Sequence, residues 1–436
     1  MEHSKRWSAP ELLMIREMGE AGVDHLRRVI REKDSLRTRV LLRVGGTWAG
    51  AISYIPNYPD LNKMRERLTT ACQVIHTLGP AARRAMPELV AAMEKGGIGE
   101  ANSVSMALNA IGVDAEMVQL LLPVLEGGAA ESPRMQMIRM LARVKPPSER
   151  TTKYLTSALK DPSPHVQQAA VSAVEQLVLS NPEVIAELKN LRRTGPLNSL
   201  QVEACSALWQ LTKEREEVLE TTFALVESEL RSYGGHQWPG SGGQGIDGTE
   251  QTICRTGDLW ARMNLESSER EKALGLLKDF CKKSGRVFIR LLLLPSMMEL
   301  GLGMGEGQLF CRQGMFSPED YYHIHGARLL AQLSERGAVD AKGVEEMLAS
   351  AQVGVRVYGA KVHWKVNRKV EVALPILIEA LDQKKHQSYY YPEIQRAALT
   401  TLREMGPEGA PAKEKLQELR SDPNPEVVKL VYEIVK

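Results

Sequence analysis

Three side chains between residues 319 and 325 are of the kinds that bind metal ions. Glu319 and His323 are four residues apart, which is about one helical turn, whereas His325 points elsewhere on a helix. Zinc in proteins takes three or four protein ligands. Two ligands do not complete such a site, so the sequence predicts a helix with mixed surface and core positions here and no metal.

The glycines from Gly240 to Gly245 match the pattern G-x-G-x-x-G. A dinucleotide site needs this pattern between a strand and the first turn of a helix, where the pyrophosphate meets the helix N-terminus. A helical pattern precedes these glycines and further loop follows them. We therefore expect a long Gly-rich loop at about residues 233–250, no cofactor, and no catalytic residue from any of the common hydrolase or nucleotide motifs.

One stretch of the sequence is rich in positive charge. Five cations precede the next acid, Glu371, and they are Arg356, Lys361, Lys365, Arg368 and Lys369. On a helix Lys361 and Lys365 share a face, so this stretch could bind phosphates or an acidic protein. The alternative is a solvated outer face, whose charge reversal would leave folding intact. The net charge of +2 favours this alternative.

Aromatic side chains gather in two irregular segments that are further candidates for partner binding. Trp48, Tyr54 and Tyr58 lie in an insertion at about residues 36–60, and His236 and Trp238 lie in the Gly-rich loop. Exposed aromatics on loops of a rigid scaffold often dominate binding energy. The same side chains could equally fold back and cap the neighbouring helices.

The composition limits the class of protein. Aromatic residues make up only 5% of 436 residues, which favours packed helices over sheets. Five dispersed cysteines without a C-x-x-C pair predict buried, reduced thiols and a cytoplasmic location. The first residues lack the apolar core of a signal peptide. The most apolar run, Val287 to Met304, is interrupted by charges and a proline, so it predicts a buried helix pair and no membrane span.

Short phrases recur along the chain and indicate a repeat array. Residues 161–166 (DPSPHV) and 422–427 (DPNPEV) each open a helical pattern, in which Ser163 or Asn424 can cap the helix before a proline. A second phrase, helix–Gly–helix, recurs at Gly19, Gly79, Gly112 and Gly406. The first of these phrases, from Gly19 to Gly22, is expected to break residues 10–33 into two helices.

The apolar periodicity predicts a series of helical pairs. These pairs lie at about residues 10–33, 61–93, 100–126, 133–160, 164–192, 198–231, 317–350, 355–382 and 389–419, with a final helix at 425–436. Trp209, Trp260 and Trp364 each end the first helix of a pair, at spacings of 51 and 104 residues. Equivalent positions in a repeat share an environment, so we expect all three indoles to be largely buried.

The phrases Leu78-Gly79-Pro80-Ala81-Ala82, DPSPHV and Ala373-Leu374-Pro375-Ile376-Leu377 resemble those of HEAT repeats, in particular of bacterial HEAT-repeat proteins. The resemblance covers most of the chain. It implies an all-α fold, a right-handed α-solenoid formed as a single domain over residues 1–436, and a scaffold that binds a protein partner without catalysis. One feature departs from the family pattern. Gln167 and Val428 replace the usual repeat arginine, so the sequence does not predict a complete Asp–Arg ladder between units.

Some relatives in that family are enzymes, including alkylpurine DNA glycosylases and bilin lyases. A base-excising enzyme would need a carboxylate beside aromatic residues on a basic concave face, and Asp258 near Trp260 is the nearest candidate. A core role for Trp260 explains it without chemistry. We therefore predict a non-catalytic scaffold. The alternative is a nucleic-acid-binding protein, with or without base-excision activity, which a concave face rich in Lys and Arg would favour.

Overall fold

The computed structural model describes residues 19–33, 61–94, 98–233, 248–317, 320–336, 340–382, 391–422 and 425–435. Every regular element within these ranges is a helix, and none of them contains a strand. The prediction of an all-α protein is confirmed. The chain forms two compact units, Met1–Thr222 and Phe223–Lys436, whose boundary falls within one helix.

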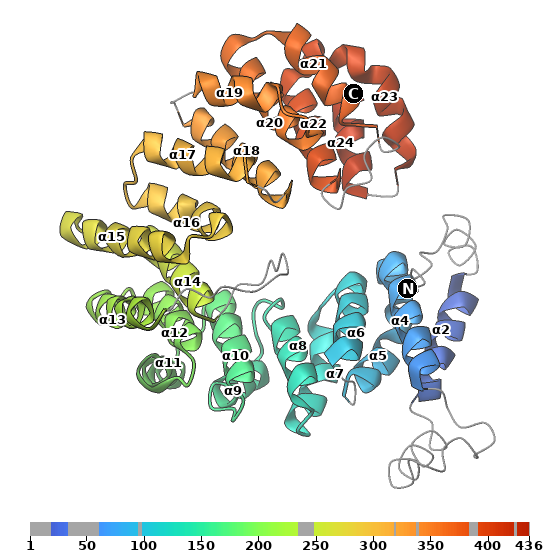
Figure 1. The fold of residues 1–436 in the computed structure, drawn as a ribbon. Helices are drawn as coiled ribbons and strands as arrows, with labels where there is room; N and C mark the ends of the chain where they lie inside the picture. Colours follow the sequence, from blue (N-terminus) through green and yellow to red (C-terminus); the bar gives the residue numbers. More distant parts are fainter. Residues whose placement is uncertain are drawn as a thin grey trace, which may run out of the picture. The chain divides into compact units, whose positions relative to one another are not determined.

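The described residues of the first unit form a succession of helices (Figure 1). They are α2 (Gly19–Lys33), α4 (Leu61–Leu78), η2 (Gly79–Ala85), α5 (Met86–Glu94), α6 (Ile98–Ile111), α7 (Ala115–Glu126), α8 (Glu131–Leu141), α9 (Glu149–Ala158), α10 (Pro164–Leu177), α11 (Pro182–Thr194), α12 (Asn198–Thr212) and α13 (Glu216–Ser232), which crosses the boundary.

The second unit continues in the same manner. Its elements are α14 (Gly248–Arg262), α15 (Ser267–Ser284), α16 (Val287–Glu299), α17 (Met304–Met315), α18 (Asp320–Glu335), α19 (Ala341–Leu348), α20 (Val353–Asn367), α21 (Val370–Glu379), α22 (Tyr391–Met405), η4 (Gly406–Ala412), α23 (Lys413–Glu418), η5 (Leu419–Ser421) and α24 (Pro425–Val435).

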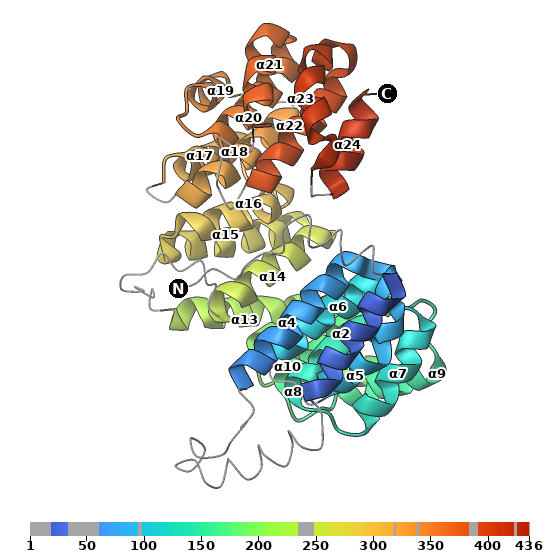
Figure 2. The same cartoon turned by 90° about the vertical axis from the view of Figure 1, so that its right-hand side faces the viewer.

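Within each unit the helices alternate between two rows (Figures 1 and 2). In the first unit α4, α6, α8, α10 and α12 pack on one another in order, and in the second unit α14, α16, α18, α20, α22 and α24 do so. We call these the first-row helices. The helices between them form the second row. Since each helix contacts mainly its pair mate and the equivalent helices of adjacent pairs, each unit has the architecture of a helical-repeat stack.

The core of each pair comes from the predicted apolar faces. In α4 the side chains of Leu68, Cys72 and Ile75 are buried, and in α10 those of Val166 and Val174 are fully buried. All five cysteines are buried and free, as predicted. Burial raises the pKa of the Cys205, Cys281 and Cys311 thiols to about 12, so they stay protonated and are poor nucleophiles at neutral pH.

The recurring Gly-Pro phrase has the same conformation at two distant places. Gly79 and Gly406 have φ angles of 57° and 58°, and each is followed by a proline and a 3-10 turn. Glycine adopts this left-handed conformation without a Cβ clash, so it ends the preceding helix. At the first phrase, α2 begins at Gly19 and runs through Gly22 to Lys33, and the helix predicted before Gly19 lies outside the described residues.

The two Asp-Pro phrases begin α10 and α24 at their second prolines, as predicted. Ser163 occupies the N-cap position, but its hydroxyl makes no capping bond; instead the Ser163 N–H donates to Asp161 Oδ1 at 2.9 Å. Asp161 also accepts from Arg134 Nη2 of α8 at 3.1 Å. Asp422 likewise accepts from Gln395 of α22 at 3.4 Å. Asp161 and Asp422 thus each accept a hydrogen bond from the preceding first-row helix. The sequence did not predict a complete Asp–Arg ladder, and at Asp422 the donor is a glutamine.

The three repeat tryptophans all lie in the last turn of first-row helices. Trp260 and Trp364 are buried, as predicted, whereas Trp209 is half-buried. The helices of Trp209 and Trp364 end in the same way: Lys213 and Arg368 adopt left-handed φ angles of 61° and 55° and place their cations over the indole rings. The repeat therefore extends beyond the tryptophan to the residue that ends the helix.

The most apolar segment differs from its prediction. It forms one helix, α16, which ends at Glu299. Gly301 follows with a positive φ of 99°, and α17 begins only at Met304. The expectation of a helix pair within residues 287–304 is therefore wrong. Pro295 lies on the exposed side of α16 without breaking it. Among the described residues, no helix combines the length and apolarity required to cross a membrane.

Candidate functional site

Several predicted site residues lie outside the described residues. They are Trp48, Tyr54 and Tyr58 of the insertion, His236 and Trp238 of the Gly-rich loop, the glycines 240–245, and Glu319. Their proposed roles remain predictions.

Two lysines of the predicted basic stretch are held by acids from neighbouring helices. Lys361 Nζ and Lys365 Nζ on α20 each lie 3.0 Å from Glu335 Oε1 on α18. Lys365 also lies 3.0 Å from Glu404 on α22. The sequence showed no acid nearby because these partners are 26 or more residues away along the chain. The alternative of a fully solvated face is therefore wrong for these lysines, and reversing their charge would place carboxylates beside Glu335.

The other three cations of the stretch have different surroundings. Arg356 donates to Glu379 at 2.7 Å and to two backbone carbonyls. Arg368 stacks on Trp364, with 5.0 Å between its guanidinium and the ring centroid. Lys369 is exposed at the start of α21. The five cations are thus divided among separate contacts and do not line a single phosphate-binding surface.

The candidate metal and base-excision groups are also separated. His323 contacts the Ser317 carbonyl oxygen, whereas His325 contacts Arg328, and burial followed by Arg328 lowers the pKa of His325. The described residues contain no cluster of three metal-binding side chains. Asp258 is exposed and accepts from Ser296 at 2.5 Å, whereas Trp260 is fully buried against Phe223. Asp258 and Trp260 therefore do not share a pocket.

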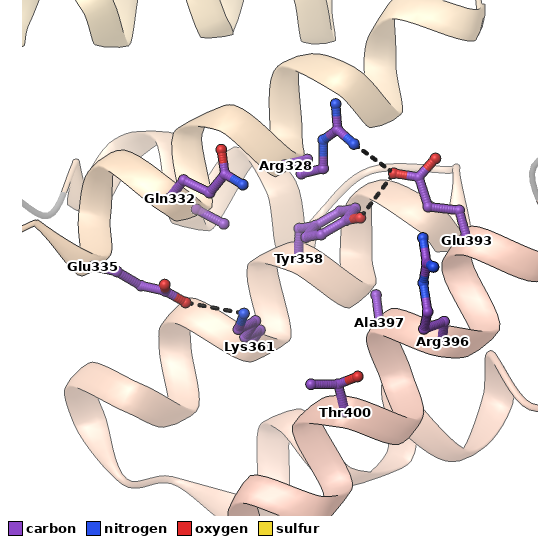
Figure 3. A pocket seen from close by; sticks show the side chains of 10 residues that line it. Arg328, Gln332, Glu335, Tyr358, Lys361, Glu393, Arg396, Ala397 and Thr400 are labelled. Carbon is purple, nitrogen blue, oxygen red and sulfur yellow. Dashed lines mark hydrogen bonds and ion pairs between the residues drawn. The ribbon is translucent and has the colours of Figure 1, made fainter. Parts of the chain in front are cut away.

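A polar pocket of about 230 Å³ lies among α18, α20 and α22 (Figure 3). Its charged and polar walls come from Arg328, Gln332 and Glu335 of α18, Tyr358 and Lys361 of α20, and Glu393 and Arg396 of α22. Spacings of three, four or seven residues place these side chains on one face of each helix. The three first-row helices thus contribute to one surface.

The depth of the polar pocket follows from small side chains. Ala331 of α18 and Ala397 and Thr400 of α22 line it where larger residues would fill the space between helices. A volume of about 230 Å³ is below the range of about 300–1,000 Å³ typical of sites for drug-sized ligands and cofactors. It is suited to single side chains or another small group.

Charges in this pocket are arranged in two groups. At one end Glu393 Oε1 accepts from Arg328 at 3.3 Å and from the Tyr358 hydroxyl at 3.2 Å. Burial raises the pKa of Tyr358, so its hydroxyl remains a neutral donor. At the other end burial opposes the ionisation of Glu335, but hydrogen bonds from Lys361 and Lys365 outweigh it and lower the pKa of Glu335. Glu335 is therefore ionised, and both acids already accept hydrogen bonds from neighbouring side chains.

One cation of the pocket is less strongly engaged. The Arg396 side chain is 55% exposed, and its ion pair with Glu426 is long, at 3.6 Å. In Figure 3 it extends from α22 towards the end of the pocket that holds Glu393. Exposed pairs of this kind contribute little energy. Arg396 can therefore exchange Glu426 for an incoming anion at small cost.

A second, mostly apolar pocket of about 350 Å³ adjoins the first between α16 and α18. Its apolar walls are Leu294, Pro295, Met298, Leu329 and Leu333. Arg336, which pairs with Glu299 at 2.9 Å, also lines it. Gln332 and Glu335 line both pockets, so the two are neighbours across the exposed face of α18. We call them together the two-pocket groove.

Sequence reasoning missed most of this groove. Arg328, Gln332 and Glu335 do recur at the spacing of one helix face, and so do Glu393, Arg396 and Thr400. That signal was available. The sequence does not show that α18 and α22 pack on either side of α20. The groove residues of α20 are 23 or more residues from those of α18 and α22 along the chain.

Comparison with protein families gives a match over part of the chain. A family described as HEAT repeats matches residues 118–209, from within α7 to the last turn of α12. The resemblance inferred from the repeated phrases is confirmed for that stretch. The comparison with curated proteins returned no match.

Solved structures offer distant likenesses. The chain is similar to the karyopherin Kap121p at 11% identity and a TM-score of 0.35, covering 96% of this chain and 54% of that one. Kap121p bound to Pho4p gives 13% identity, a TM-score of 0.32, and 98% and 50% coverage. A chain from work on the interaction between cadherin and beta-catenin gives 14% identity and a TM-score of 0.30, covering 100% of this chain and 98% of that one. This chain spans about half the length of the karyopherin chains.

Proposed function

We propose that this protein is a non-catalytic scaffold of HEAT-like repeats that binds a protein partner on its first-row helices. The observation that carries this proposal is the two-pocket groove, in which an apolar pocket adjoins a charged one on a surface built from four successive first-row helices. Mixed apolar and polar anchoring is typical of protein interfaces. The HEAT-repeat match in the first unit supports the same class of function.

We extend the family assignment to the whole chain, including its resemblance to bacterial HEAT-repeat proteins, because the same turn phrase and the same helix ends occur in both units. A reducing, cytoplasmic location accords with five free, buried cysteines.

A nucleic-acid-binding role is the competing proposal. It would require cations free to meet phosphates. In the described part of the first-row surface, Lys361, Lys365 and Arg403 instead lie within 3.0 Å of acids on neighbouring helices. We therefore rank protein binding above nucleic-acid binding.

The discriminating experiment is affinity capture with the full chain from its source cell, with and without nuclease treatment. Bound protein should be identified by mass spectrometry and bound nucleic acid by staining. A stoichiometric protein partner that survives nuclease is expected. Recovery of nucleic acid alone, or of proteins that all disappear with nuclease, would contradict the scaffold proposal.

A further inference from the structure

We propose that the two-pocket groove binds a short partner segment that places an apolar side chain in the apolar pocket and a carboxylate in the polar pocket. This inference rests on the proposed scaffold function and adds the chemistry of the ligand. The occupant is a protein segment with an Asp or Glu a few residues from an aliphatic or aromatic residue.

The apolar pocket provides the anchor. Leu294, Leu329 and Leu333 are buried at its base, while Pro295 and Met298 remain more exposed at its walls. Methionine adapts its shape to different side chains, and a pocket with buried leucines excludes water once it is filled. A volume of about 350 Å³ accommodates a single large apolar side chain with part of its backbone.

The polar pocket selects the charge. Three cations line it, Arg328, Lys361 and Arg396, against two acids, Glu335 and Glu393. Lys365, just beyond the lining, adds a second cation to Glu335. The acids already accept hydrogen bonds, so a further cation would find no open acceptor of comparable strength. A carboxylate can instead form a two-point pair with the exposed Arg396 guanidinium.

The same acids disfavour polyphosphate ligands. A phosphate chain would carry several negative charges past Glu335 and Glu393, and like charges at short range repel. A single carboxylate next to an apolar group needs only one favourable position. This contrast is why we assign the groove to a protein segment and not to nucleic acid.

Gln332 connects the two pockets. Its side chain is exposed on α18 between them and offers both donors and an acceptor to a peptide backbone. In an extended segment, alternate side chains lie on one side and are about 7 Å apart, so two anchors of one short segment can reach adjoining pockets.

The test uses the full chain and a fluorescent peptide library in which one Leu or Phe and one Glu are placed at every separation up to one helical turn. Binding is measured by fluorescence anisotropy. We expect some members to bind, and replacing their Glu with Gln or Lys to weaken binding about tenfold or more, as expected for loss of a charge-assisted bond.

Two variants locate the site. Gln332→Trp fills the entrance to both pockets without removing a buried contact, and it should abolish binding. Arg396→Glu should weaken binding of the acidic peptides about tenfold or more. The matched control is Arg403→Glu on the same helix, because Arg403 also pairs with an acid of α24 but does not line the groove. Circular dichroism should confirm folding of all three.

Several outcomes would overturn the inference. Peptide binding that tolerates both Gln332→Trp and Arg396→Glu would place the ligand elsewhere. Binding that is lost in Gln332→Trp but indifferent to peptide charge would exclude the carboxylate. Loss of self-association in Gln332→Trp would make a second copy the occupant. If no peptide binds, but a captured protein partner is unaffected by both variants, the groove inference fails while the scaffold function stands.

Discussion

At the scale of single residues, Trp364 combines three roles. It is buried, its indole N–H donates to Glu408 at 2.8 Å, and the Arg368 cation lies over its ring. The residue therefore fixes the end of α20 against η4. Trp209 shares the stacked cation but is half-buried.

Replacing Trp364 with Ala should lower the free energy of unfolding by about 3–5 kcal/mol, since a large aromatic leaves a cavity in a packed core. Urea denaturation measures this loss. Trp209→Ala is the comparison and should cost less, because less of that ring is removed from water. Equal losses at both positions would show that burial does not set the effect.

Glu335 is stabilised as an anion. Its pKa is below the ordinary value of 4.5, because the two lysines outweigh burial. A lowered pKa in the folded state contributes stability above the unfolded-state pKa, and this contribution disappears as pH falls through the folded-state pKa. Since the side chain is 36% exposed, solvent screening keeps the contribution modest.

Glu335→Gln should therefore reduce stability by about 0.5 kcal/mol at neutral pH. The difference from wild type should shrink as pH falls below the ordinary glutamate value. Thermal denaturation of both proteins across this range gives the comparison. A difference that is constant with pH would contradict the ion-pair account.

At the scale of helices, glycines set how closely pair mates approach. A Cβ on Gly326 of α18 would lie 2.5 Å from the Cys311 carbonyl oxygen and 2.8 Å from the Met315 nitrogen, both in α17. Because both atoms belong to the backbone, the helices themselves would have to move apart. The position of α18, and with it one wall of the groove, depends on this contact.

Gly326→Ala should consequently destabilise the protein by about 1–3 kcal/mol, the usual cost of overpacking. Gly275→Ala in α15 is the matched control, as a Cβ there meets nothing within 4 Å. That change should stabilise by up to about 1 kcal/mol through helix propensity. If both variants behaved alike in urea denaturation, close α17–α18 packing would not be the cause.

Much of the helical layout could be predicted from the sequence, and the reasons are local. Apolar spacing located α4 and α10, and the Gly-Pro phrase located the turns after Leu78 and Met405. One failure is also local. In the apolar run at 287–304 the charges and the proline suggested two helices, whereas Pro295 lies inside the single helix α16 without breaking it.

The candidate site was much less predictable. Sequence reasoning found Lys361 and Lys365 but favoured a solvated outer face for them. Their partners Glu335 and Glu404 come from helices on either side, and a contact of that range leaves no trace in local periodicity. The groove depends on which helix faces adjoin, and only packing decides this.

At the scale of the whole molecule, basic and acidic residues are nearly equal in number, and many of them pair with one another. The chain has 56 basic and 54 acidic residues. In both units ion pairs join successive repeats, as in Arg65–Glu100, Arg134–Asp161 and Arg403–Glu433. These pairs use cations that a nucleic-acid-binding surface would leave free.

We therefore expect weak affinity for double-stranded DNA or RNA at physiological salt. The binding constant should fall only slightly as salt increases, because few counterions are released on binding. Anisotropy titrations at increasing salt test this. Tight binding with a steep salt dependence, lost in Arg396→Glu but retained in Arg403→Glu, would favour the nucleic-acid alternative.

The central claim is that a protein partner binds on the two-pocket groove. Its most direct test is quantitative capture from the source cell by wild type, Gln332→Trp and Gln332→Ala side by side. The account predicts that one partner is retained by wild type, substantially retained by the Ala variant and lost from the Trp variant. An identical set of bound proteins for all three chains would contradict it.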